Sequence, residues 1–122
     1  MELVFYKKLS VSASATDSSE HLPLYRNMTI KAARLVADTA VTASSTDFVN
    51  IKLINGSVTL GSRSFEEDNI AAGASEAIAL TGGDSLDFAD LDELKITYDQ
   101  TGTSGMAFDG GIVLVFEPRR DV

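Results

Sequence analysis

The sequence predicts an all-β protein, an antiparallel β-sandwich of about seven or eight strands. Short runs such as Leu94–Tyr98 alternate between apolar and polar residues, and this period of two is typical of a strand with one buried face. Clusters of Gly, Ser, Thr and Asp separate these runs and are typical of turns. Between the runs no periodic segment has the length of a helix, which argues against a parallel βαβ sheet.

The first strand is expected over Leu3–Val11, where apolar residues recur up to Val11. A polar connection rich in Ser and Thr should follow over residues 12–27, with Pro23 near its end. Because proline cannot donate a hydrogen bond to a ladder, this stretch is expected to be a loop or a sheet edge. Its length is unusual for a connection within a compact domain, which favours a functional or mobile segment.

The second strong strand is expected over Met28–Ala37. Its apolar positions change phase at Ala32-Ala33, and a β-bulge would account for that change. A short helix is the alternative, because Lys31–Ala37 also contains good helix formers.

A turn region of small residues separates this strand from the next one, expected over Asp47–Ile54. Asn55-Gly56 then predicts a tight hairpin, since both residues tolerate a positive φ. The returning strand should run over Ser57–Phe65, and an acidic loop over Glu66–Gly73 should follow it.

The rest of the chain is expected to hold a short strand over Glu76–Thr81, a short strand and turn over Ser85–Glu93, and longer strands over Glu93–Asp99 and Gly111–Glu117. A Gly-rich hairpin loop, Gln100–Gly110, should join the last two, and Pro118 should end the last one. The topology is expected to be jelly-roll-like, with an immunoglobulin-like sandwich as the alternative. The Cys–Trp–Cys pattern of immunoglobulin domains is absent, since the chain has neither residue.

The expected core consists of the apolar residues on one face of these strands: Ile30, Leu35, Val49, Ile51, Leu53, Leu80, Leu94, Ile96, Tyr98, Ile112, Leu114 and Phe116. A chain of 122 residues is long enough for one domain around such a core, so a single domain over residues 1–122 is expected. With 44% hydrophobic residues, disorder over most of the chain is excluded.

Charge and composition exclude several function classes. The net charge of −8 argues against binding the phosphates of nucleic acids or an anionic membrane surface. The absence of cysteine excludes disulfides, thiolate nucleophiles and Cys-ligated metals. Neither a signal-peptide pattern nor an apolar run of about 20 residues occurs, so we expect a soluble protein that does not use the general export route.

No residue of the chain stands out as catalytic, so we expect that the protein is not an enzyme. His21 is the single histidine and lies in the polar stretch without any motif around it. A Ser–His–Asp triad would have to use it, yet the sequence has no Gly-x-Ser-x-Gly nucleophile motif.

No metal or cofactor site is expected either. Acidic residues cluster in two regions, at Glu66, Glu67 and Asp68 and at Asp84, Asp87, Asp90, Asp92 and Glu93. Neither follows the Asp-x-Asp-x-Asp-Gly pattern of a calcium loop, and Asp at turns often bonds its own backbone. The glycine-rich segments Gly82-Gly83-Asp84 and Gly102–Gly105 lack the Lys-Ser or Lys-Thr of a phosphate-binding loop.

Several stretches together resemble the small β-sandwich virion proteins of tailed bacteriophages, most of all the head decoration, or cement, proteins. The resemblance covers about Met28–Glu117 and is carried by Ala33–Ala37, Asp47–Gly56, Asp92–Tyr98, Thr101–Phe108 and Gly110–Phe116. Some tail and fibre domains share these turn-and-strand patterns, so a structural or receptor-binding tail or fibre module is the alternative. The family has no catalytic residues to carry over.

This resemblance implies a mechanical function. Cement proteins bind the outer surface of an icosahedral head, often as homotrimers at three-fold sites, and stabilise the shell against the pressure of packed DNA. It implies the major capsid protein as the partner, a location on the outer capsid surface of the virion, and synthesis in the host cytoplasm. Neither nucleic acid nor a membrane is expected as a partner.

Overall fold

The computed structural model describes residues 2–24 and 26–119. In these residues it has nine strands and a short 3-10 helix: β1 (Leu3–Val11), β2 (Ser18–Pro23), β3 (Met28–Ala37), β4 (Phe48–Asn55), β5 (Val58–Ser64), β6 (Ser75–Ile78), η1 (Gly83–Leu86), β7 (Asp87–Phe88), β8 (Glu93–Thr101) and β9 (Phe108–Pro118). The prediction of an all-β antiparallel sandwich is confirmed. Within the described ranges, no helix is long and apolar enough to span a membrane.

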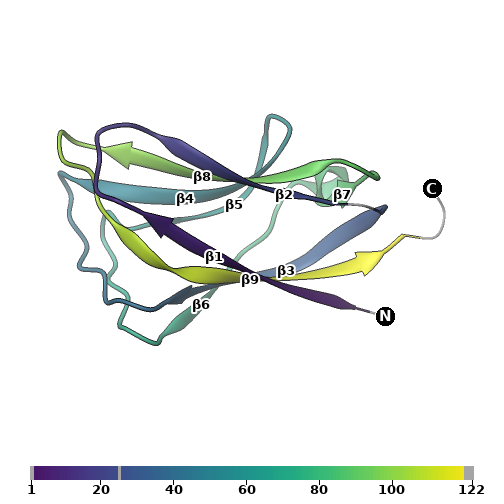
Figure 1. Cartoon of the computed structure of the whole chain (residues 1–122), viewed down its shortest axis with the longest axis horizontal. Helices are drawn as coiled ribbons and strands as arrows, with labels where there is room; N and C mark the ends of the chain where they lie inside the picture. The colour runs from purple at the N-terminus through teal and green to yellow at the C-terminus, as the bar shows by residue number, and fades with distance from the viewer. Residues whose placement is uncertain (1, 25, 120–122) are drawn as a thin grey trace.

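The strands form two antiparallel sheets that pack face to face (Figure 1). Sheet A has the order β1-β9-β3-β6, with the short β7 also paired to β3, and sheet B has the order β2-β8-β4-β5. Along the chain, most connections pass from one sheet to the other. This order is that of a jelly roll, in which eight strands fold as two Greek keys. An immunoglobulin-like sandwich would instead pair its first two strands within one sheet.

The stretch 12–27, expected to be a polar connection, contains strand β2. The stretch was expected to be a loop or a sheet edge. The structure shows a sheet edge, because β2 pairs only with β8. Leu22 is half-buried and faces the interior, whereas Pro23 ends the strand, where a missing donor costs little. The connection between β1 and β2 is therefore short, from residue 12 to residue 17.

Strand β3 has the expected bulge, one residue earlier than predicted. Its pairing to β9 shifts register between Ile30 and Ala32, not at Ala32-Ala33. As a result Lys31 and Ala32 are both exposed, and Ala33 is buried. The alternative prediction, a short helix over Lys31–Ala37, is wrong, because this stretch pairs with β9 on one side and β6 on the other.

The tight hairpin is confirmed, one residue later than predicted, because Asn55 still belongs to β4 and pairs with Val58, so that Gly56 and Ser57 form the turn. Gly56, with a φ of 63°, occupies the first central position of the two-residue turn, where a side chain would be strained.

The segment Gln100–Gly110 is not the hairpin loop that was predicted. Strand β8 ends at Thr101 in sheet B, and β9 begins at Phe108 in sheet A. The loop between them crosses from one sheet to the other and is anchored on the way, since the Ser104 backbone N–H donates to Asp47 Oδ1 at 2.9 Å. Glycine-rich loops of either kind look alike in a sequence, because turn residues do not specify which strand pairs next.

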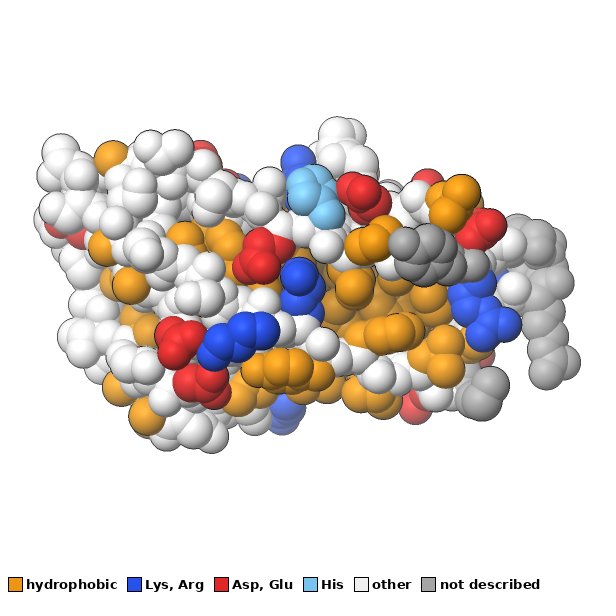
Figure 2. Space-filling model, in the orientation of Figure 1, with side chains coloured by type: hydrophobic (Ala, Val, Ile, Leu, Met, Phe, Trp, Pro, Cys, Tyr) orange, Lys and Arg blue, Asp and Glu red, His pale blue; other side chains and the backbone are white. Residues whose placement is uncertain are grey.

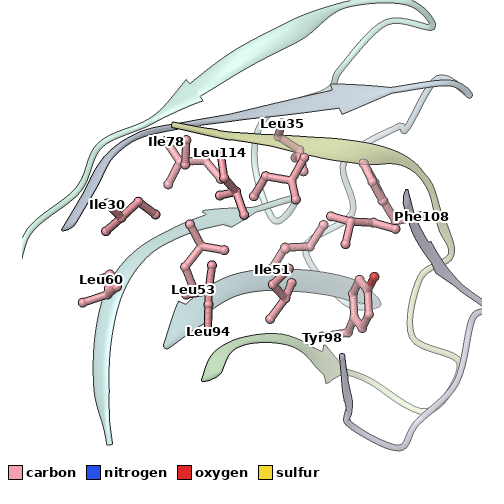
Figure 3. Packing of buried hydrophobic residues seen from close by; sticks show 14 of the residues in the cluster. Ile30, Leu35, Ile51, Leu53, Leu60, Ile78, Leu94, Tyr98, Phe108 and Leu114 are labelled. Atoms are coloured by element: carbon pink, nitrogen blue, oxygen red, sulfur yellow. The ribbon is translucent and has the colours of Figure 1, made fainter. Parts of the chain in front are cut away.

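The core lies between the inner faces of the two sheets (Figure 3). Eleven of the twelve expected core residues are buried, and Leu80 is half-buried because β6 ends two residues before it. Large buried side chains outside the expected core are Phe65, Phe88, Phe108, Leu60 and Leu9.

Candidate interaction surface

The residues weighed for catalysis do not form a catalytic group. His21 lies on edge strand β2, where its Nδ1 is 2.9 Å from Glu93 Oε2 and its side chain is half-exposed. Lys95 is its register partner on β8. Among the residues that the structure describes, no three His, Asp or Glu side chains are placed to hold a metal ion.

Two side chains of the acidic clusters hold the neighbouring turn and strand in place. Asp92 Oδ2 accepts from the Ala89 backbone N–H at 2.9 Å, and Asp87 accepts from the Thr29 hydroxyl. Gly82, Gly83, Gly102 and Gly105 all have positive φ angles, which is the role of glycine in tight turns. These two carboxylates and four glycines therefore have structural roles.

The outer face of sheet B is polar. Its outward-facing residues alternate with the buried ones along each strand, and most carry hydroxyl, amide or charged groups: Ser19, His21, Asn50, Lys52, Ser62, Ser64, Lys95, Thr97 and Asp99. Lys52 Nζ and Asp99 Oδ2 form an ion pair at 2.6 Å across this face. Such a face is stable in contact with water.

The outer face of sheet A is different, because a cluster of apolar side chains lies on it among charged and hydroxyl-bearing ones. We call it the apolar face and define it by Val4, Tyr6, Ala32, Val36, Ala77, Val113 and Val115, together with the cations Lys31 and Arg34. Val4 is 66% exposed and Tyr6 is 58% exposed. Clustered apolar side chains of this kind mark an interaction site far more often than scattered ones do.

The strand register brings these residues into adjacent rows. Val115 on β9 lies between Val4 and Ala32, its partners on β1 and β3. Val113 lies in the same way between Tyr6 and Arg34. The Tyr6 ring covers Gly111, where a Cβ atom would collide with it. The row Val4, Val115 and Ala32 forms an apolar strip across three strands, and the row of Tyr6 and Val113 extends it on two of them.

The charges on this side of the protein are partly unpaired. Lys8 Nζ lies 2.8 Å from both Asp38 and Asp109, and hydrogen bonds to Asp109 and Asp38 raise the pKa of Lys8 above its ordinary value. Lys31 and Arg34 have no ion pair within the described part of the chain. A protein of net charge −8 thus presents two cations without an ion pair, among the described residues, beside this apolar strip.

An apolar groove lies next to this face, where the sandwich is open between edge strands β1 and β2. It has a volume of about 310 Å³ and is lined by Leu3, Phe5, Leu22, Pro23, Leu24, Arg26 and Met28. Figure 2 shows hydrophobic side chains gathered in this hollow between the two strands. Toward the other end of the edge, Lys7 Nζ and Glu20 Oε1 form an ion pair at 3.6 Å between β1 and β2.

The sequence held a signal for the apolar face that we did not use. Leu3–Tyr6 and Ile112–Phe116 are uninterrupted apolar runs, so both faces of β1 and β9 carry apolar side chains. A strand with one face in solvent alternates between apolar and polar residues. A continuous apolar run indicates that both faces of the strand are covered when the protein functions.

No protein-family model matches this chain, and no curated protein matches it in sequence. Among solved structures, a chain in the structure of infectious bursal disease virus, Gx strain, is 12% identical over 99% of this chain, with a TM-score of 0.43. The present chain spans 33% of the length of that chain. A likeness this distant carries no argument about function, which has to be inferred from the residues of the chain itself.

Proposed function

We propose that this chain is a bacteriophage capsid decoration, or cement, protein that binds the major capsid protein on the outer surface of the assembled head. The observation that carries the proposal is the asymmetry of the sandwich. One outer face is polar, and the other presents an apolar strip beside two cations. A protein with one side on a shell and the other in solvent needs this asymmetry. The sequence resemblance to head decoration proteins supports the choice of shell.

In this proposal the apolar face is the surface that meets the shell. Burying Val4, Tyr6 and the two valines of β9 provides the hydrophobic contribution, at about 25 cal/mol per Å² of apolar surface removed from water. Lys31 and Arg34 pair with carboxylates of the shell, which favours a matching orientation. The remaining acidic surface faces solvent and keeps the protein soluble.

In this proposal, many weak contacts between the protein and the capsomers stabilise the shell. As the resemblance implies, the protein acts as a homotrimer at three-fold sites and bridges neighbouring capsomers. A trimer that engages several sites at once binds more tightly than one subunit does, because later contacts are intramolecular. The protein is made in the host cytoplasm and remains on the virion, with no catalytic role.

The test replaces the exposed apolar residues of β1. The double variant Val4→Ser/Tyr6→Ser should keep the fold, since both side chains lie outside the core. It should lose at least about tenfold in affinity for purified undecorated heads of the parent phage, measured by co-sedimentation. The matched control is Val58→Ser, which alters a 39% exposed valine on sheet B.

Unchanged binding of the double variant would contradict the assignment of the apolar face.

Electron cryomicroscopy of the parent virion decides the location of the protein. Density for this chain on the outside of the head supports the proposal. Density inside the shell, or on the tail or fibres, overturns it, and tail density favours the tail or fibre module instead.

A further inference from the structure

Leu91 is the most exposed large hydrophobic residue among those described, at 67%. It lies in the turn between β7 and β8 and has a φ of 70°. In the described ranges it is the only non-glycine residue with a positive φ. A bulky side chain adopts this conformation only when its surroundings impose it, and such strain often marks a functional position.

Hydrogen bonds impose this conformation. The Leu91 N–H donates to the Leu24 carbonyl at 2.6 Å, and the Leu24 N–H donates to the Asp92 carbonyl at 2.9 Å. The Asp90 N–H donates to Asn27 Oδ1 at 2.8 Å. The turn is therefore fixed to the segment after β2, and Leu91 is held in solvent as a rigid knob.

The apolar groove begins beside this knob, because Leu24 both bonds to the Leu91 turn and lines the groove. The groove has half-buried Leu3, Phe5 and Leu22 among its walls. Its one charged lining residue is Arg26, which is exposed and has no ion pair within residues 2–24 and 26–119.

Knob and groove are complementary in both polarity and charge. Leu91 is flanked in the chain by Asp90 and Asp92, so an apolar tip carries carboxylates beside it. The groove is apolar and carries the guanidinium of Arg26. We propose that the occupant of the groove is a second copy of this chain, with Leu91 inserted among Leu3 and Phe5 and Asp90 paired with Arg26.

This contact deepens the oligomer part of the proposed function and rests on it for the number of subunits. Each subunit carries both a knob and a groove, so head-to-tail contacts generate a ring when the rotation closes, and a two-fold dimer exchanges both knobs. Because the two surfaces are neighbours on one subunit, both can lie close to a single rotation axis. This placement suits a small closed ring such as the proposed homotrimer.

The first test uses Leu91→Gly. Glycine accepts a positive φ without strain, so the variant should remain folded and its melting temperature should not fall. Its self-association should weaken at least about tenfold, measured by size-exclusion chromatography with light scattering over a range of concentrations. Val58→Ser is the control and should assemble like the unmodified protein.

The second test exchanges the charges. Arg26→Asp and Asp90→Arg should each weaken self-association, and the double variant should restore it, because the pair is reformed in reverse. Among the described residues the Asp90 side chain has no hydrogen bond or ion pair, and the turn is anchored by the Asp90 backbone N–H. Failure of the double variant to recover, or wild-type assembly of Leu91→Gly, would overturn the proposed contact.

The two proposals fail in different ways. The variant Val4→Ser/Tyr6→Ser should still assemble in solution but should no longer bind undecorated heads. The variant Leu91→Gly should be monomeric and retain weak binding to undecorated heads. A dimer that depends on Leu91 supports the contact and overturns the trimer. A protein that is monomeric in solution at all concentrations and also on the shell overturns the contact.

Discussion

At the residue scale, Tyr98 shows how a buried polar group ties the open edge together. Its side chain is 1% exposed, and its hydroxyl donates to Glu20 on edge strand β2. Glu20 also forms the ion pair with Lys7 on β1, so the three side chains connect β8, β2 and β1. Burial raises the pKa of Tyr98 well above its ordinary value, and the hydrogen bond to Glu20 raises it further.

This shift predicts a loss of stability in alkali. An unfolded tyrosine loses its proton at a pH of about 10, whereas the folded state keeps it, so the free energy of unfolding should fall as the pH rises above about 10. Tyr98→Phe should cost about 1–2 kcal/mol at pH 7 and should show a flatter decline above pH 10. Urea unfolding at several pH values measures both effects.

The comparison is specific to Tyr98. Lys8, whose pKa is also raised, is present both in the unmodified protein and in the Tyr98→Phe variant. Its contribution therefore cancels when the free energies of unfolding of the two proteins are subtracted. Equal slopes for the two proteins above pH 10 would contradict the role of Tyr98.

At the element scale, β9 organises sheet A because it pairs with β1 on one side and β3 on the other. Two glycines at its beginning allow these approaches for different reasons. A Cβ at Gly110 would collide with the backbone carbonyl of Val36, which cannot move without disturbing β3. The three atoms nearest to a Cβ at Gly111 all belong to the exposed Tyr6 side chain.

The two glycines should therefore differ in tolerance. Gly110→Ala should destabilise the protein by about 1–3 kcal/mol, because the backbones of β3 and β9 must separate. Gly111→Ala should cost less than about 1 kcal/mol, since the Tyr6 side chain can swing away into solvent. Denaturant unfolding compares the two variants, and similar losses in both would count against this account of the register.

At the scale of the whole molecule, the jelly roll joins the ends of the chain. β1, the first strand, pairs along its length with β9, the last. Neither sheet can be completed until distant segments have met, and the core between the sheets depends on both. The two outer faces then differ in composition, because one is polar and the other carries a cluster of apolar side chains.

This topology predicts slow, cooperative folding. Closing long loops before their contacts form is entropically costly, so refolding should occur in milliseconds to seconds rather than microseconds. Stopped-flow fluorescence or circular dichroism after dilution from urea measures the rate. Refolding complete within about 100 μs would indicate that local contacts dominate, contrary to this structure.

The sequence by itself determined most of the segments that are strands and most of the residues that form the core. The period of two in Leu94–Tyr98 and the turn residues Asn55-Gly56 were sufficient, because alternation and turn chemistry are local properties. β2 was harder to predict, since an edge strand with one neighbour needs few apolar residues. For the apolar face, the continuous run Ile112–Phe116 was the available sign.

Only the tertiary structure decided how the strands pair and what lies together on the surface. The glycine-rich segment Gln100–Gly110 was compatible with a hairpin, yet it crosses between the sheets. Leu24 and Leu91 are distant in the chain, and their hydrogen bond sets the knob beside the groove. Pairing between distant strands is decided by the packing of the whole core, which local patterns of residues do not record.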